Sequence, residues 1–548
     1  MNRFKYLKVI TAILGITSLA ACTKLDQHLN SNLTQTEAAN SFNASLFLQS
    51  AYNDVGNPYS DLGNIFALEE VTSDECLVPT RGGDWDDNGK WRALHQHAWA
   101  KDGVDIFLAM FNALNKIQFD ATNVFTFKPN ATQIAQAKFI RAISLYQLFD
   151  LWNQFPFRNP GDTLLNAPKV MRGAEAIQFI IDDVNSAIAD LPEAGANGVN
   201  VASKDAARVL LMRLYLNRGA FLNRAAPTWP DADMQKVIAI GDTIINSGHY
   251  SYMTNYFDNF NSSNSTSTEA IFACPNKSGV ATNNTGISNR WYAPLHYNQW
   301  AVKKGAAGWN GFSTVASTYD MFQTNGTSTA RGPADTLIDK RIGGRFYPGV
   351  TNISGVRPGF LIGQQYDENH LPYVDRKNPP NLLSFDPNIN PTLKETGNNL
   401  ELTGIRVVKY PPDYSQGTAS YDNGGNWMIL FRYPEVVLMV AEAKMRAATP
   451  DNVGALTMVN ALRLVRGAAP LATMTLFNPA NVYDPKTLLA ERGRELYWED
   501  IRRTDLIRFG VFLNAWEYKS ASTAKFLLFP LPSQSLATNP NLIQNTGF

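Results

Sequence analysis

The sequence lacks three features that would each define a class of protein: many cysteines, an excess of one charge, and a long apolar run in its body. Only 3 of its 548 residues are cysteine, so the chain is not a disulfide scaffold. Its 48 basic residues equal its 48 acidic residues, which argues against a nucleic-acid partner, since that would need a clustered basic surface. The most apolar internal segment, residues 428–445, carries charged side chains, and we expect no membrane-spanning helix there.

Two of the cysteines, Cys76 and Cys274, lie in the body of the chain. They could form one disulfide, or both could stay free and buried, and the sequence leaves the two alternatives open. Hydrophobic residues make up 45% of the chain, which is enough for the core of one large domain or of two to three ordinary ones.

The N-terminus has the order of a secretory signal. A basic start with Arg3, Lys5 and Lys8 precedes an uncharged run over residues 9–21. This run is shorter than the roughly 20 apolar residues that a membrane-crossing helix needs. It ends in Leu19-Ala20-Ala21-Cys22, which resembles the bacterial lipobox. We therefore predict a signal peptide over residues 1–21, cleaved before a lipidated Cys22. The alternative is an ordinary signal peptide that is cleaved near a cysteine.

The remaining chain reads as a tether followed by one domain. Residues 22–40 are polar and lack hydrophobic periodicity, which is typical of a flexible tether between a lipid and a folded domain. We predict a single domain over residues 41–548. Its helical scaffold covers about 41–254 and 426–548, and these two parts enclose a loop-rich insertion over about 255–425.

Apolar residues at steps of three and four predict a mostly α fold. The clearest example runs from residue 175 to residue 191, where isoleucine and valine recur on one face and Pro192 stops the helix. Asp451 and Asp484 are the predicted N-caps of two later helices. The predicted helices are 131–152, 175–191, 206–216, 234–245, 432–447, 452–466 and 485–498.

Short motifs occur in a fixed order behind the lipobox. They are Thr72-Ser73-Asp74-Glu75, Ala137-Lys138-Phe139-Ile140-Arg141-Ala142, Gly308-Trp309-Asn310-Gly311, Phe431-Arg432-Tyr433-Pro434-Glu435, Glu491-Arg492-Gly493-Arg494-Glu495-Leu496 and the closing Asn539-Pro540-Asn541-Leu542-Ile543. In their order and spacing they resemble the SusD/RagB family of Bacteroidetes outer-membrane nutrient-uptake lipoproteins.

The resemblance implies a tetratricopeptide-like helical-hairpin scaffold without enzymatic activity. It also implies a partnership with a SusC-like TonB-dependent transporter, over whose barrel the lipoprotein sits as a lid and to which it delivers a glycan. The protein would then be anchored to the outer membrane by its lipid alone and face the cell exterior.

Two loop-like stretches combine tryptophan with amide and charged side chains, as sugar-binding sites do. Aromatic faces stack on the C–H surfaces of sugars, while polar side chains hydrogen-bond the hydroxyls. Loops rarely offer a core that buries a tryptophan. By position in the family, the resemblance points to glycan-binding residues among Asp74, Arg81, one of Trp85, Trp91 or Trp99, and Trp291, Tyr292 or Trp309. The alternative for any one aromatic is that it packs its loop onto the scaffold.

The stretch from Asp84 to Gly89 also fits the first half of an EF-hand calcium loop, with oxygen ligands from Asp84, Asp86 and Asn88. The twelfth position of that loop is His95 instead of glutamate. A turn rich in Asp and Asn is the interpretation we favour, and we expect no cofactor.

Glu491, Glu495 and Glu499 share one helix face, as the carboxylate pair of a glycoside hydrolase would. The arginines at positions 494, 502 and 503 stand at ion-pairing spacings, and we favour a salt-bridged scaffold. The sequence also lacks the G-x-S-x-G, G-x-x-x-x-G-K-[ST], H-E-x-x-H and C-x-x-C motifs.

These observations lead to one functional hypothesis with two alternatives. We expect a surface lipoprotein that binds an oligosaccharide or polysaccharide and hands it to a TonB-dependent transporter without cleaving it. The alternatives are a glycoside hydrolase or lyase that uses the glutamates, and an uptake lipoprotein for a peptide or another non-sugar nutrient.

Overall fold

Most of the chain beyond residue 42 is described by the computed structural model, and Ala44–Phe548 forms one compact unit. The described residues are 43–163, 165–280, 282, 284–299, 307–322, 339–343, 356–367, 369, 371–377, 379–395, 401–413 and 423–548. The predicted signal peptide, Cys22 and the predicted tether lie outside them. No helix in this described part combines the length and the apolar character needed to cross a membrane.

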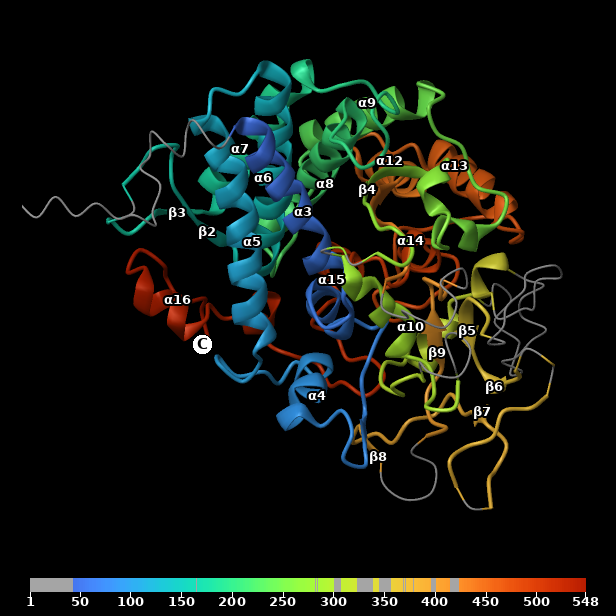
Figure 1. The fold of residues 1–548 in the computed structure, drawn as a ribbon. Coiled ribbons are helices and arrows are strands. Elements are labelled where there is room, and N and C mark those ends of the chain that lie inside the picture. The colour runs from blue at the N-terminus through green and yellow to red at the C-terminus, as the bar shows by residue number, and fades with distance from the viewer. Residues whose placement is uncertain are drawn as a thin grey trace, which may run out of the picture. The chain divides into compact units, whose positions relative to one another are not determined.

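The first half of this unit is a series of helices, most of which pack on the next one in the chain (Figure 1). They are α3 (Ala44–Ser60), α4 (Lys90–His95), α5 (Ile106–Asn123), α6 (Ala131–Trp152), α7 (Gly173–Ala187), α8 (Lys204–Leu222) and α9 (Asp231–Asn246). α3 packs on α5, and contacts then run from α5 through α6, α7 and α8 to α9. Neighbouring helices that cover one another in this way confirm the predicted tetratricopeptide-like scaffold.

The C-terminal helices extend the same stack. They are α12 (Tyr433–Arg446), α13 (Asn452–Val465), α14 (Leu488–Leu496), α15 (Arg502–Arg508) and α16 (Ser533–Thr538), while the short α10 (Asn289–Tyr292) and α11 (Ala316–Asp320) lie in the insertion. α12 packs on both α9 and α13, as Figure 1 shows. The two ends of the sequence therefore share one scaffold, as the mostly α fold class predicts.

Helix α6 has the bounds that its apolar pattern predicts, and local capping explains them. The Asn130 side chain accepts a hydrogen bond from the Gln133 N–H at 2.9 Å, and the Gln133 side chain accepts one from the Asn130 N–H at 3.0 Å. This capping box satisfies two donors at the start of the helix. At the other end Asn153 adopts φ 60°, the left-handed conformation that terminates helices.

Helix α14 begins three residues later than predicted. Asp484 does not cap it, because its carboxylate accepts from the N–H two residues further on and closes a turn before the helix. The cap is Thr487, whose hydroxyl accepts from the N–H three residues later at 3.1 Å. Asp451, in contrast, caps α13 as predicted, through a 2.8 Å bond from the Gly454 N–H.

The described strands are short and form two-stranded pairs. The pairs are β1 (Thr80–Arg81) with β8 (Lys394–Glu395), β2 (Gln154–Phe157) with β3 (Lys169–Arg172), β4 (Ala270–Cys274) with β10 (Met428–Arg432), β5 (Gly359–Leu361) with β9 (Arg406–Val408), and β6 (Gly363–Gln364) with β7 (Ser384–Phe385). The antiparallel pair of β4 and β10 joins the start of the insertion to its end. The insertion therefore leaves the scaffold and returns to it at one place.

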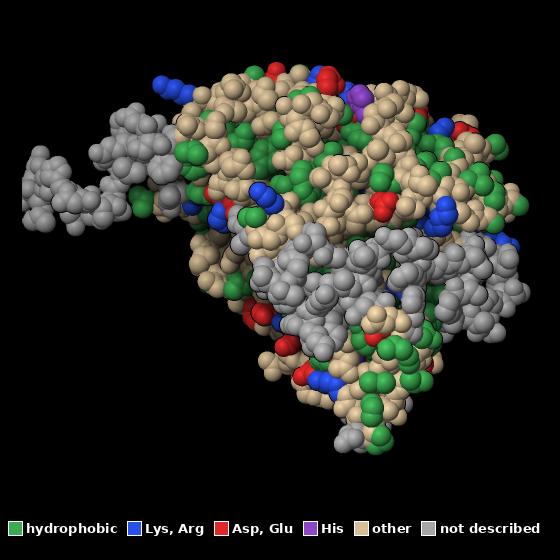
Figure 2. Space-filling model, turned by 45° about the vertical axis from the view of Figure 1, so that its right-hand side comes forward, with side chains coloured by type: hydrophobic (Ala, Val, Ile, Leu, Met, Phe, Trp, Pro, Cys, Tyr) green, Lys and Arg blue, Asp and Glu red, His purple; other side chains and the backbone are tan. Residues whose placement is uncertain are grey.

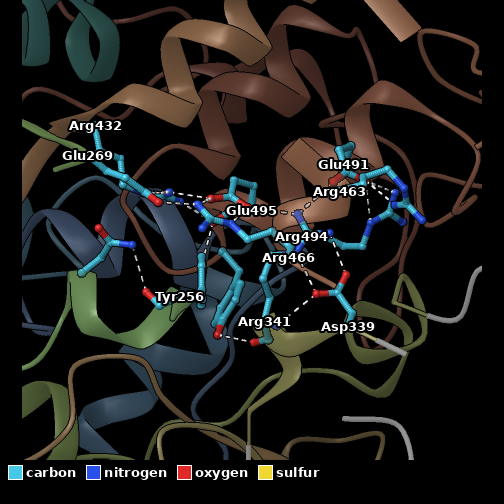
Figure 3. A network of polar contacts seen from close by, with 12 residues as sticks. Tyr256, Glu269, Asp339, Arg341, Arg432, Arg463, Arg466, Glu491, Arg494 and Glu495 are labelled. Carbon is cyan, nitrogen blue, oxygen red and sulfur yellow. Dashed lines mark hydrogen bonds and ion pairs between the residues drawn. The ribbon is translucent and has the colours of Figure 1, made fainter. Parts of the chain in front are cut away.

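A buried network of arginines and glutamates lies between α14, the start of β4 and the end of β10 (Figure 3). Glu495 pairs with Arg432 at 2.6 Å and with Arg466 at 2.8 Å, and Arg341 reaches the same carboxylate at 3.0 Å. Glu269, just before β4, pairs with Arg432 at 3.2 Å and with Arg466 at 2.8 Å. All of these side chains are at most 1% exposed. Burial by itself would raise the pKa of Glu495, but the arginines outweigh it and lower the pKa to about 2.

Glu491 lies in the same network, which confirms the salt-bridged interpretation of the glutamate face. Its partners, all within 2.8 Å, are Arg341, Arg463 and Arg494. Two of the predicted partners bind elsewhere: Arg502 pairs with Asp74 at 2.7 Å, and Arg503 lies 3.7 Å from Asp150. The sequence identified the buried acids but not the arginines that reach them from distant segments.

The question of a disulfide is settled by the positions of the two body cysteines. Cys76 and Cys274 are both buried and both free. Burial raises the pKa of the Cys274 thiol to about 12, which keeps the thiol protonated and unreactive at neutral pH.

The network predicts a large effect for one isosteric change. Glu495→Gln removes a buried negative charge and leaves its arginines partly unpaired, so we expect the free energy of unfolding to fall by about 3–5 kcal/mol. Chemical denaturation measures this change.

Lys169→Ala is the matched control, since it breaks an exposed ion pair with Glu175 in which the side chains are 62% and 56% exposed. We expect that loss to stay below about 1 kcal/mol. Equal losses for the two variants would contradict a structural role of the buried network.

Candidate functional site

The centre of the candidate site is the exposed indole of Trp309. It is 42% exposed, whereas the ring behind it, that of Tyr292 on α10, is buried. The two rings stack with their centroids 5.5 Å apart and their planes inclined by 22°. The Trp309 N–H also donates to the Tyr292 carbonyl at 2.7 Å. Tyr292 therefore supports the ring of an indole that is partly exposed to solvent.

Trp85 also contacts the loop that carries Trp309. Its Nε1–H donates to the Trp309 carbonyl at 2.8 Å, and its ring meets the edge of Phe312 with centroids 5.5 Å apart. Trp85 adopts φ 60°, a conformation that non-glycine residues rarely adopt without support. Gly311 makes room for it, because a Cβ at this position would lie 2.4 Å from the Trp85 ring. Trp85 and Trp309 are thus fixed relative to each other.

A second aromatic group at the site pairs Tyr297 with Arg376. The Arg376 guanidinium carbon lies 3.5 Å from the centre of the Tyr297 ring, close enough for a cation–π interaction. The Tyr297 hydroxyl donates to the exposed Asp84 carboxylate. Burial and this bond raise the pKa of Tyr297 to about 12, so the hydroxyl stays protonated. Because Asp84 and Trp85 are consecutive, one loop contacts both aromatic groups.

Glu401 fixes the position of Arg376. The two side chains pair at 2.9 Å, and the buried His296 reaches the other oxygen of Glu401 at 2.9 Å. Burial raises the pKa of Glu401, but the bond with His296 and the contacts with Arg376 outweigh it and lower the pKa to about 2. The carboxylate is therefore ionised at neutral pH. No motif in the sequence marked Arg376 or Glu401, because both lie in irregular sequence without periodicity.

Apolar side chains extend the surface beyond Arg376. Figure 2 shows hydrophobic side chains gathered at the lowest part of the view, where Figure 1 places the segment between β6 and β7. The exposed apolar residues of this segment are Tyr366, Leu371, Val374 and Leu382. The arrangement combines flat aromatic faces with ionised and hydroxyl groups, which suits a ligand that has both C–H and hydroxyl surfaces.

Six of the predicted site residues are each less than 6% exposed: Asp74, Arg81, Trp91, Trp99, Trp291 and Tyr292. Tyr292 supports the exposed Trp309 ring, and the other five lie in the core. Asp74 is held by Arg502, and the Arg81 guanidinium donates to the Thr403 hydroxyl at 2.6 Å. The loops of these five residues fold onto the scaffold and bury their side chains, while ligand contact by them stays a prediction.

The tryptophans show the physical reason most clearly. Trp91 lies on α4 and donates to the Asp87 carboxylate at 2.6 Å. Trp99 packs against Phe526 and Phe529, more than 400 residues away, with centroids 4.8 Å and 5.1 Å from its own. The structure brings Trp85, Tyr292 and Trp309 together at the surface, and Trp91 and Trp291 pack behind them, each with its ring centroid 5.9 Å from that of Trp85 and of Tyr292 respectively.

The residues that fit the first half of a calcium loop contact protein groups. Asp84 accepts from Tyr297, and Asp86 pairs with Arg92 at 2.8 Å. Asn88 adopts φ 54°, within a tight turn. Within the described ranges no three His, Cys, Asp or Glu residues gather in a way that could hold a metal ion. The turn interpretation explains these contacts without an ion.

A sequence model of the SusD family matches residues 268–548, just over half of the chain. The chain belongs to the SusD family. The starch-binding protein SusD of Bacteroides thetaiotaomicron is 24% identical over 514 residues, which cover 88% of this chain and 85% of that protein.

Solved SusD-type structures share the fold of this SusD-family chain. A SusD-like protein from Bacteroides fragilis superposes with a TM-score of 0.67 at 18% identity, covering 94% of this chain and 98% of that one. Surface glycan-binding protein A from Bacteroides thetaiotaomicron, solved in complex with laminarihexaose, gives a TM-score of 0.62 at 15% identity and covers 92% and 98% of the two chains. The resemblance inferred from the motifs is confirmed.

The close approach at Gly311 in this SusD-family protein predicts a local effect. Gly311→Ala places a methyl group against the Trp85 ring, so the indole must move and its hydrogen bond to Trp309 weakens. We expect the Trp85 indole N–H resonance, assigned with Trp85→Phe, to shift in nitrogen–proton NMR spectra.

Gly83→Ala is the control in the same loop, since a Cβ there meets nothing within 4 Å. It should leave that resonance in place. An unchanged resonance in Gly311→Ala would show that Trp85 is not fixed by this contact.

Proposed function

We propose that this protein is a cell-surface glycan-binding lipoprotein, which captures an oligosaccharide or polysaccharide and delivers it to a TonB-dependent outer-membrane transporter. The observation that carries the proposal is the solvent-facing indole of Trp309, supported by Tyr292 and positioned by Trp85, in a chain of the SusD family. Two members or structural neighbours of that family are named for binding starch or for a complex with laminarihexaose.

The chemistry of the site supports a sugar ligand. A fixed, half-exposed indole offers a flat apolar face, onto which the C–H face of a pyranose can stack without ordering a flexible side chain first. Arg376 and the carboxylates of Asp84 and Glu401 supply donors and acceptors for ring hydroxyls. The charges of Arg376 and Glu401 compensate each other, so this pair selects neither an anionic nor a cationic ligand.

The carboxylates that first raised the possibility of hydrolysis support binding without cleavage. Glu491 and Glu495 are 0% exposed and paired with arginines, so neither can meet a glycosidic bond. We therefore propose a non-catalytic role, in line with relatives that are named as binding proteins.

Attachment through a lipid on Cys22 would hold the domain at the outer membrane. The lipobox-like sequence and the family support this location, a surface-facing orientation and a SusC-like transporter as the partner.

Removal of the stacking surface tests the binding role. Trp309→Ala deletes the indole, and we expect affinity for the bound glycan to fall by about 30-fold, the effect of losing one central aromatic contact. Calorimetry against a panel of neutral oligosaccharides that includes maltoheptaose and laminarihexaose measures this change.

Phe119→Ala is the matched control, because this ring on α5 is 41% exposed, close to the exposure of Trp309. It should leave affinity unchanged. Wild-type protein that binds no saccharide of the panel would contradict the proposal, and release of reducing ends from any of them would favour a hydrolase.

Isolation from native membranes tests the location and the partner. We expect the affinity-tagged protein to sediment with the outer membrane and to co-purify with a TonB-dependent barrel protein. Cys22→Ser removes the acyl acceptor, and this variant should leave the membrane fraction. Sedimentation that does not depend on Cys22, or isolation without a barrel protein, would refute the corresponding part of the proposal.

A further inference from the structure

A second cleft lies in a different part of the fold from Trp309. It has a volume of about 770 Å³, within the range of small-molecule binding sites, and is lined by α3, the start of α6 and the segment that follows β4. Figure 1 shows α3 and α6 in the helical part of the unit, apart from β6 and β7 near the first site. None of the Trp309-site residues lines this cleft.

The lining of this cleft is dominated by side-chain amides. Among the described residues that line it, eight are asparagine or glutamine, including Gln49 and Asn53 on α3 and Gln136 on α6. These described lining residues include no carboxylate and no guanidinium, and Lys277 is their one basic side chain. Each amide presents both a donor and an acceptor, so the amides together match a ligand whose groups both donate and accept hydrogen bonds.

Several of these groups are held in place by the scaffold. The Asn276 amide donates to the Asn426 carbonyl at 2.9 Å and accepts from the Thr282 hydroxyl at 2.5 Å. Tyr52 lies half-buried on α3, and its hydroxyl accepts from the Ala202 N–H at 3.0 Å, which fixes the orientation of its ring. A ligand would therefore meet an ordered surface, which lowers the entropy lost on binding.

We propose that this cleft is a second binding site for a neutral oligosaccharide, separate from the Trp309 site. Hydroxyl groups both donate and accept hydrogen bonds, and amides satisfy them without the desolvation of a charge. A phosphorylated or carboxylated ligand would need more cationic groups than Lys277. A hydrocarbon ligand would cover lining amides such as Gln136 and Asn200 without satisfying their donors and acceptors.

A polymer that passes over two sites of one chain gains avidity, because the second contact is intramolecular. Two modest sites can therefore retain a long glycan where one site would release it. A short oligosaccharide, which reaches only one site at a time, should bind each site separately and with its own affinity.

Calorimetry with the panel of neutral oligosaccharides, including maltoheptaose and laminarihexaose, tests the inference. We expect two molecules bound per wild-type chain. Asn53→Trp places an indole in the cleft from an exposed position, so one molecule should stay bound, at the Trp309 site. In Trp309→Ala one molecule should stay bound, in the cleft. The combined variant should bind none. Gln178→Trp, at an exposed amide on α7 outside the cleft, is the matched control and should keep both.

A gentler variant keeps the test independent of a large side chain. Gln136→Ala with Asn200→Ala removes two lining amides, and we expect the affinity of the cleft to fall by about tenfold without a change in the melting temperature. If the wild-type chain binds one molecule, and this binding is lost in Trp309→Ala but unaffected by Asn53→Trp, the proposed second site is wrong while the proposed function is supported. No binding of any saccharide would overturn both.

Discussion

The pairing of Glu495 with Arg432 and Arg466 is the interaction on which the rest of the unit depends. Each of these charges is almost fully buried, and a buried charge costs several kcal/mol unless its partners are in place. Arg432 ends β10, Arg466 directly follows α13, and Glu495 lies on α14. The charges are therefore paired only when all three segments have come together. The network therefore specifies one arrangement of the scaffold, and the apolar contacts around it supply most of the stability.

The same network determines the position of the candidate binding surface. Glu269 and Arg432 lie next to the paired ends of β4 and β10, through which the insertion leaves and re-enters the scaffold. Arg341 belongs to the insertion itself and joins the network through Glu495. Irregular chain that carries Trp309, Tyr297 and Arg376 is thereby attached to a rigid base. Loops fixed in this way present their aromatic rings with little further loss of conformational entropy on binding, which favours the capture of a flexible glycan.

The sequence predicted the features that depend on local chemistry. Helix α6 has its predicted bounds because its apolar pattern and its capping box lie in adjacent residues. Helix α14 begins later than predicted because Asp484 and Thr487 are both competent caps, and only the folded turn decides between them. The burial of Trp99 could not be predicted from the local sequence, because the aromatic rings that cover it come from the other end of the chain. The motif around Trp309 pointed to one part of the candidate surface, while Arg376 could be placed there only through its contact with Tyr297 in space.

Contacts between the two ends of the chain have a consequence for how the protein is made. The Glu75 carboxylate accepts from the Trp498 N–H at 3.2 Å, and Asp74 binds Arg502, so residues near position 75 are completed by residues near position 500. Loop closure over such a span is slow and cannot begin before the last helices exist. If secretion starts at the N-terminus, as the proposed signal peptide implies, residues near position 75 emerge first while Asp74 still lacks its partner Arg502. The chain would then cross the membrane unfolded. It would need protection from aggregation until its last fifty residues emerge and complete the core.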